Sequence, residues 1–315
     1  MNACSKKEDE KKEEEDSTSV ETSSGTGSGS GSGSGVPESE AGAPEPGTNI
    51  TVSEVTHTGF KVNWGAATDP DQNSFIYKVV YALSSGDIDT IDEADAITGS
   101  AVIADLPSSA TSATISGLTL ATKYAVTVVV TNSKDKRSIY VPVEQTTLPM
   151  RMFVTSTRIA ASFANAAAVD AYCNSDANKP SDGSTYKAMI AGAAWRKACT
   201  SPRCNATGTT GQVDWVFAAN KPYGRKDRTM IGTTNANSIL PDPILAAIDP
   251  TNNYGVWGGF DETWQSSGSN CTAWTASGSN ADGIDPSPYY LDAAHWFNGG
   301  APGCTSNSGL VCVEQ

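Results

Sequence analysis

Cysteine is the residue type whose number and spacing suggest chemistry most directly in this sequence. Six of the seven cysteines lie between Cys173 and Cys312, and none of them forms a CxxC pair. An even set without zinc-like spacing favours disulfides, and therefore an oxidising compartment. Cys199 and Cys204 are separated by four residues, which predicts a local disulfide. The other four cysteines allow three pairings, and spacing does not choose among them.

A group of cations is the second candidate for chemistry, here for ligand binding. It consists of Lys221, Arg225, Lys226 and Arg228. Ammonium and guanidinium groups could hold a sulfated glycan or an acidic patch on a protein. The alternative interpretation is a solvated turn that begins at Lys221-Pro222-Tyr223-Gly224.

Residues that could perform catalysis are few. His295 has Asp292 three positions before it, but the sequence contains no Gly-x-Ser-x-Gly elbow. Every cysteine of the C-terminal part is assigned to a disulfide, so no thiol remains there as a nucleophile. Acidic pairs such as Asp261 with Glu262 are expected to be solvated or to order a turn. The sequence therefore predicts no enzyme and no catalytic residue.

Metal binding and cofactor binding also lack support. The two histidines, His57 and His295, fall in different predicted domains. The loop from Asp69 to Asn73 offers oxygen ligands, but it lacks the glycine and the distant glutamate of an EF-hand loop. Such clusters usually form solvated turns. We expect no metal site and no cofactor.

The elements that must position these residues begin after a low-complexity segment. Residues 1–47 contain a Lys/Glu block, a Gly-Ser run and several prolines, a composition that predicts a disordered, acidic tether. The chain has a net charge of −14, and half of this excess lies in the tether. This acidity argues against nucleic-acid binding. No apolar run approaches the roughly 18–20 residues of a membrane-spanning helix.

The seventh cysteine, Cys4, has its own context. It follows the small residue Ala3 and precedes a charged, polar tract. This pattern resembles the first residues of a mature bacterial lipoprotein, although the signal sequence that would precede it is missing. The resemblance implies acylation of Cys4 and a protein held on the bacterial outer membrane, at the cell surface, by its lipid only. The alternative is an accidental cysteine in a disordered tail.

Residues 48–148 show short alternating apolar runs separated by turn residues, which predicts an all-β sandwich. Trp64 lies on the second predicted strand and Tyr77 and Tyr81 on the third. Gly117-Leu118 followed by Tyr124 matches a tyrosine corner. These residues resemble a fibronectin type III domain, for which the role of spacer or weak contact surface is expected.

Residues 150–315 have a different pattern. Phe153 to Thr155 is predicted to form a strand, and the segments 160–173 and 186–195 carry helix-compatible patterns. The rest is rich in Gly, Ser, Asn and Pro, which predicts loops. Six of the seven tryptophans lie here, and a domain with few aliphatic residues is expected to use them, together with disulfides, as its core. They are Trp195, Trp215, Trp257, Trp264, Trp274 and Trp296.

A set of motifs carries a second resemblance in this region. They are Ala171-Tyr172-Cys173, Tyr186-Lys187-Ala188-Met189-Ile190, Val256-Trp257-Gly258-Gly259, Asn270-Cys271-Thr272-Ala273-Trp274-Thr275, Gly303-Cys304 and Leu310-Val311-Cys312-Val313-Glu314. They resemble the endostatin-like domain of unknown function found in surface lipoproteins of spirochaetes and other bacteria. The resemblance implies an α+β, C-type-lectin-like, disulfide-stapled domain. It also implies the nested pairs Cys173–Cys312 and Cys271–Cys304.

The same resemblance implies a function. Bacterial members of this endostatin-like family bind extracellular-matrix proteins such as laminin and fibronectin, or plasma proteins such as plasminogen and complement regulators, and the resemblance implies the same here. This sequence departs from endostatin by its slight acidity and by the missing zinc histidines. The calcium-binding motifs of sugar-binding C-type lectins do not occur either. The alternative function, from another class, is a carbohydrate-binding or structural envelope module without a host protein partner.

Overall fold

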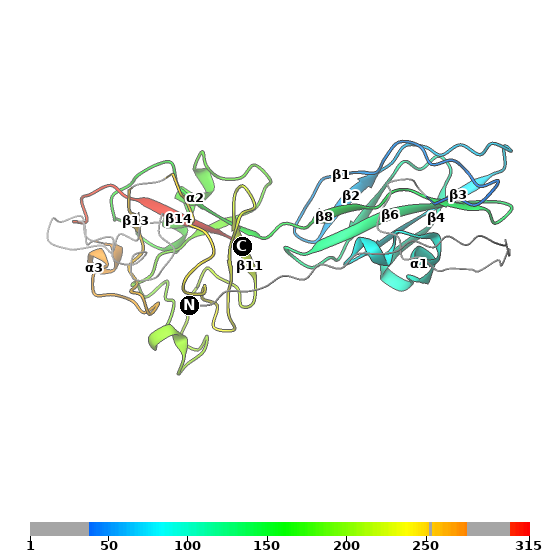
Figure 1. Cartoon of the computed structure of the whole chain (residues 1–315). Coiled ribbons are helices and arrows are strands. Elements are labelled where there is room, and N and C mark those ends of the chain that lie inside the picture. The colour runs from blue at the N-terminus through cyan, green and yellow to red at the C-terminus, as the bar shows by residue number, and fades with distance from the viewer. Residues whose placement is uncertain (1–37, 252–253, 276–302) are drawn as a thin grey trace, which may run out of the picture. The chain divides into compact units, whose positions relative to one another are not determined.

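The computed structural model describes residues 38–251, 254–275 and 303–315 (Figure 1). Cys4, His295, Asp292 and Trp296 lie outside these residues, and so does most of the predicted tether. No helix among the described residues is long and apolar enough to cross a membrane.

The first domain consists of two antiparallel sheets (Figure 1). Alternating side chains of both sheets, including Phe60, Val62, Trp64, Tyr77 and Val79, meet in one buried core. The smaller sheet has the strand order β1 (Thr51–Ser53), β2 (Gly59–Asn63) and β5 (Ser112–Ser116). The larger has the order β4 (Val102–Pro107), β3 (Phe75–Ala82), β6 (Lys123–Asn132) and β7 (Arg137–Ile139), and β8 (Val143–Thr146) also pairs with β6.

The tyrosine corner expected at Tyr124 is present. The Tyr124 hydroxyl accepts a hydrogen bond from the backbone N–H of Thr119 at 3.1 Å. The ring of Tyr124 also packs edge-on against Tyr81, with 6.0 Å between the centroids. The sandwich and its corner therefore agree with the fibronectin type III interpretation.

A helix that the sequence analysis did not predict covers the outer face of the larger sheet. Helix α1 (Ile91–Ala96) begins with a capping box, in which Thr90 and Glu93 bind each other's backbone N–H groups. Its apolar residues form a second small core, and Ile91 and Ala94 are fully buried in it. This core also contains Val80, Ile88, Ala125, Val129 and Ile139.

The predicted end of the tether at residue 47 is wrong. The backbone N–H of Glu40 binds the carbonyl of Arg137 at 2.9 Å, and the two side chains form an ion pair at 3.0 Å. Further along, the Ser138 hydroxyl donates to the Pro44 carbonyl at 2.5 Å. A proline-rich segment can lie extended along a strand edge without donating N–H groups. Residues 38–47 thus belong to the first domain.

The C-terminal domain is β-rich and is built on one mixed sheet (Figure 1). Its strand order is β10 (Tyr186–Ala188), β14 (Gly309–Glu314), β9 (Met150–Val154), β11 (Pro222–Arg225) and β12 (Met230–Thr233), and β13 (Val256–Trp257) also pairs with β14. Strand β9 runs antiparallel to β14 and parallel to β11. The first and last strands of the domain are therefore neighbours.

Both faces of this sheet are buried. Met152 and Val154 face one core together with Val311 and Val313. Phe153 faces the other core, which also contains all four cysteines of the two disulfides that join distant parts of the chain. Three of the predicted core tryptophans, Trp257, Trp264 and Trp274, are at most 2% exposed. Aromatic residues and disulfides thus make up much of the interior, as expected from the composition.

One of the two predicted helices is wrong and the other is shorter than expected. Helix α2 occupies Ala166–Ser175, because the Asn165 side chain accepts from the Ala168 N–H at 2.9 Å and caps the helix there. The segment predicted as a helix over 186–195 instead begins with strand β10. Its alanines are compatible with a helix, but pairing with β14 decides its conformation.

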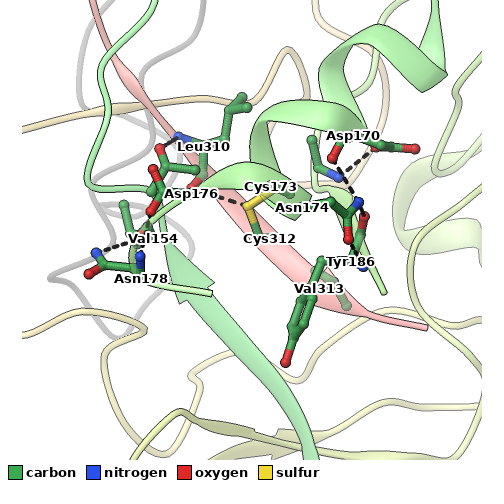
Figure 2. Close-up of a disulfide and its surroundings, with 12 residues drawn as sticks. Val154, Asp170, Cys173, Asn174, Asp176, Asn178, Tyr186, Leu310, Cys312 and Val313 are labelled. Atoms are coloured by element: carbon green, nitrogen blue, oxygen red, sulfur yellow. Dashed lines mark hydrogen bonds between the residues drawn. A yellow bond between two sulfur atoms is a disulfide. The ribbon is translucent and has the colours of Figure 1, made fainter. Parts of the chain in front are cut away.

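Three disulfides are present: Cys173–Cys312, Cys199–Cys204 and Cys271–Cys304. They are the local pair expected from spacing and the two nested pairs implied by the resemblance. Figure 2 shows the first, which attaches α2 to β14. The amide of Asn174 in α2 exchanges two hydrogen bonds with the backbone of Tyr186, at 2.7 and 2.9 Å. A side chain on the helix therefore bonds to β10 as a neighbouring strand would.

Candidate functional site

A hollow of about 400 Å³ lies at the edge of β9 in the C-terminal domain. Strand β11 pairs with β9 only as far as Arg225, which lies opposite Met152. Phe153 and Val154 therefore extend past the end of the neighbouring strand. The segment 248–251 also lines the hollow.

Strand β11 ends where it does because the chain turns sharply toward β12. The Asp227 carboxylate accepts the Thr229 N–H at 3.0 Å and pairs with the Arg225 guanidinium at 3.1 Å. The hydrogen bond from the Thr229 backbone, with help from Arg225, holds the pKa of Asp227 below its usual value. Arg228 adopts a φ of 73°, a left-handed conformation common in tight turns.

The walls of the hollow combine apolar and polar groups. Met152, Phe153, Val154, Ile248 and Pro250 contribute the apolar part. Among these, Pro250 is exposed, whereas the others are mostly covered by the two cores. A few polar groups set in an apolar hollow are typical of ligand sites.

Asn178 closes the edge of β9 next to the hollow. Its side-chain amide donates to the Val154 carbonyl at 2.9 Å (Figure 2). The Asp176 carboxylate holds Asn178 by accepting its N–H at 2.8 Å. Burial alone would raise the pKa of Asp176, but hydrogen bonds from Ser156, Asn178 and Thr157 lower it, so the carboxylate stays charged. This anchors the rim of the hollow.

Two cations and two carboxylates line the hollow, and three of these four charges are already engaged. Arg225 donates to Asp227 and, at 2.9 Å, to the Thr229 hydroxyl. Asp249 accepts both the N–H and the hydroxyl of Thr251, at 3.0 and 2.7 Å. Lys226 is exposed and has no ion-pair partner among the described residues. The hollow therefore presents one unpaired ammonium group.

Of the four cations proposed from the sequence, the structure brings two to the hollow. Arg225 and Lys226 line it, whereas Lys221 and Arg228 are exposed outside it. The cluster of charges in the sequence pointed to the turn after β11. No sequence signal pointed to the segment 248–251, because only the fold brings it to the hollow.

The acidic pair Asp261–Glu262 and the candidate calcium loop lie in turns, as expected. One oxygen of Asp69 accepts the N–H groups of Asp71 and Asn73, and the other accepts the Asn132 amide at 2.8 Å. Asp261 similarly accepts the N–H of Thr263. Within residues 38–251, 254–275 and 303–315, no group of three or more His, Cys, Asp or Glu side chains could hold a metal.

A charged network that no sequence pattern predicted surrounds Glu314. Its carboxylate, 2% exposed, accepts from the Arg151 backbone N–H at 2.8 Å and from the Arg151 guanidinium at 2.9 Å. The His57 ring lies 2.9 Å from it. Burial would raise the pKa of Glu314, but the bonds from His57 and Arg151 lower it to about 2. The bond to Glu314 in turn raises the pKa of His57.

Family comparisons divide the chain in the same way as the fold. Residues 42–144 match the fibronectin type III domain, and residues 156–288 match the family described as "Protein of unknown function (DUF1554)". The chain thus contains a fibronectin type III domain followed by a domain of unknown function. Fibronectin type III domains are typically non-catalytic binding or structural modules, and neither family description names an enzyme.

No curated protein matches the chain. Among solved structures, a myokine matches at 17% identity and a TM-score of 0.25, covering 33% of this chain and 98% of its own. The third fibronectin III domain of human KIAA0343 protein has 20% identity and a TM-score of 0.25, covering 39% and 93%.

A structure of the fibronectin domains of chicken CNTN1 also matches, at 17% identity and a TM-score of 0.26. The match covers 35% of this chain, which spans 33% of that one. All three scores are too low to support a structural comparison.

Proposed function

We propose that this protein is a tethered, non-enzymatic binding protein of a bacterial surface, whose C-terminal domain binds an extracellular-matrix or plasma protein. Laminin, fibronectin, plasminogen and complement regulators are the candidates that the endostatin resemblance implies. Lipidation at Cys4 would anchor the chain in the outer membrane, and the fibronectin type III domain would act as a spacer.

We further propose that the C-terminal domain has an endostatin-like, C-type-lectin-like fold. Three observations support this. The first and last strands, β9 and β14, pair antiparallel, and Cys173–Cys312 attaches the first helix to the last strand. The disulfide Cys271–Cys304 is nested within that span.

The hollow beside β9 carries the binding proposal. It combines an apolar surface with the unpaired ammonium group of Lys226 on a rigid, disulfide-bonded scaffold. Apolar hollows with a few placed polar groups are typical of ligand sites.

The test is binding of the full, oxidised chain to immobilised laminin, fibronectin, plasminogen and a complement regulator. Saturable binding at micromolar concentration to at least one of them is the expected result. Absence of binding to all four would contradict the proposal. Saturable binding to a glycan array instead would favour a carbohydrate-binding envelope module.

A further inference from the structure

We infer that the hollow beside β9 binds a short peptide segment of a partner protein, which carries a single carboxylate next to an aliphatic or aromatic side chain. This inference rests on the proposed function, since it names the chemistry by which the same domain would recognise a protein. It goes further by assigning the contact to Lys226 and Arg225.

The unpaired donors at the hollow define the charged part of the ligand. Lys226 has no ion-pair partner among the described residues. Arg225 uses Nε and one terminal nitrogen for Asp227 and Thr229, while its Nη1 has no hydrogen bond to a described residue. An ammonium and a free guanidinium nitrogen at one hollow suit an anionic oxygen acceptor.

The charge balance limits that ligand to one anionic group. Asp227 and Asp249 line the same hollow as Arg225 and Lys226, so the lining has no net charge. A polyanion such as a sulfated glycan would meet both carboxylates, and like charges repel. A single carboxylate on an otherwise neutral segment could face Lys226 while avoiding them.

The size and surface of the hollow define the rest of the ligand. Its volume of about 400 Å³ is at the lower end of the range of roughly 300–1,000 Å³ typical of ligand sites. This admits a short segment rather than a folded surface. Pro250, the exposed apolar side chain of the lining, offers apolar contact, which suits an aliphatic or aromatic neighbour of the carboxylate.

Because Asn178 occupies the edge of β9, we expect the hollow to recognise the side chains of the peptide and not its backbone. Because the Asn178 amide already binds the Val154 carbonyl at 2.9 Å, an added strand would have to compete with Asn178 for that carbonyl. Specificity should therefore depend on the carboxylate and its apolar neighbour.

The experiment measures binding of labelled pentapeptides to the full chain by fluorescence anisotropy. The peptides carry a central Glu or Asp flanked by Leu, Ile, Val or Phe, and each has an amide counterpart with Gln or Asn. We expect saturable binding of the acidic peptides and about fivefold weaker binding of the amide ones, the strength of a partly exposed ion pair. NMR shifts should centre on Phe153, Lys226 and Thr251.

Two variants provide a matched comparison. Lys226→Gln should weaken binding of the acidic peptide about fivefold and leave binding of the amide peptide unchanged. The reason is that the substitution in the protein and the acid-to-amide change in the peptide remove the same interaction. Arg228→Gln removes the same charge from the same turn but outside the hollow, so binding should change by less than about twofold. Both side chains are exposed, so neither change should unfold the domain.

Three outcomes of the peptide experiment would overturn the inference. They are an absence of saturable binding below about 1 mM, equal weakening by both variants, and NMR shifts confined to other surfaces. Binding of a matrix or plasma protein that is unaffected by Lys226→Gln would overturn it while leaving the proposed function intact. Binding of the acidic peptides without binding of any matrix or plasma protein would contradict the proposed function and leave the peptide site in place.

Discussion

Arg196 is a fully buried cation whose charge is matched on two sides. Its guanidinium binds Asp170 at 2.7 Å and Asp214 at 2.5 Å, and it also donates to the Ala188 carbonyl at 2.8 Å. Asp170 belongs to α2, so the cluster links this helix to the segments around 188 and 214. Every one of these charges is paired, which identifies the cluster as structural.

Replacing Arg196 tests that role. Arg196→Met leaves Asp170 without its ion-pair partner and Asp214 with Lys187 alone. We expect it to lower the free energy of unfolding by about 3–5 kcal/mol, as measured by urea denaturation. Lys187→Met serves as the control, because it breaks only the half-exposed pair with Asp214 and should cost less than about 1 kcal/mol. Equal effects of the two changes would contradict this assignment.

We predict that the stability of the protein falls in acid because Glu314 becomes protonated. Its pKa is lowered to about 2 from 4.5, so its stabilising effect is present above the unfolded value and is lost as the pH falls toward 2. The shift corresponds to about 3 kcal/mol. Glu314→Gln should therefore destabilise the protein at pH 6 and approach the stability of the unaltered chain near pH 2.

His57 titrates in the opposite sense. Its pKa is raised from 6.5, so its contribution is present below that value and is lost as the pH rises through the raised pKa. Denaturant unfolding at several pH values measures both effects. Glu144→Gln is the control, since Glu144 pairs only with the exposed Lys123 and should change stability by less than about 1 kcal/mol at any pH. A pH-independent effect of Glu314→Gln would contradict the assignment.

At the scale of elements, the two kinds of disulfide should differ in what they contribute. Cys173–Cys312 spans 139 positions, whereas Cys199–Cys204 spans five. Chain-entropy arguments put the stabilisation from these disulfides at no more than about 5 and about 2 kcal/mol, respectively. Replacing both cysteines of each pair by serine should therefore destabilise the C-terminal domain more for the long pair, as measured by thermal unfolding. The reverse order would contradict the entropic explanation.

Strand β10 shows how an element can depend on its partners. Tyr186 to Ala188 pairs with Glu314 to Cys312, and Asn174 binds the backbone of Tyr186 from the side of α2. A single segment with alanines cannot reveal these partners, and the strand partner β14 comes from more than a hundred positions away in the chain. The helix prediction for this segment failed for that reason.

At the scale of the whole molecule, the two domains should respond differently to a reductant. The first domain has no cysteine in residues 38–148, and Trp64 is its one tryptophan. The C-terminal domain depends on three disulfides in its cores. We expect dithiothreitol to leave the indole NMR signal of Trp64 in place and to change those of Trp257, Trp264 and Trp274.

The oxidised chain after mock treatment is the control for that experiment. Loss of the Trp64 signal together with the others would mean that the two domains unfold as one unit. Survival of all four signals would mean that the cores of the C-terminal domain do not need their disulfides.

The amino-acid sequence determined several features through local patterns. Alternating apolar residues between Ile50 and Val130 specified the sandwich, since alternation matches the two faces of a strand. The even number and spacing of cysteines specified the disulfide-bonded domain, and the tryptophan content specified its core. The cations at 225 and 226 were visible as a cluster.

Only the tertiary structure decided the remaining features, because they depend on residues brought together from distant positions. It gave the segment at 186 a strand partner, placed α1 over the outer sheet face, and set Asp170 and Asp214 around Arg196. It also separated Arg225 and Lys226 from Lys221 and Arg228, by ending β11 at the hollow that the segment 248–251 also lines. The hollow is lined by segments from several parts of the chain, and the local spacing of residues does not predict which distant segments come together.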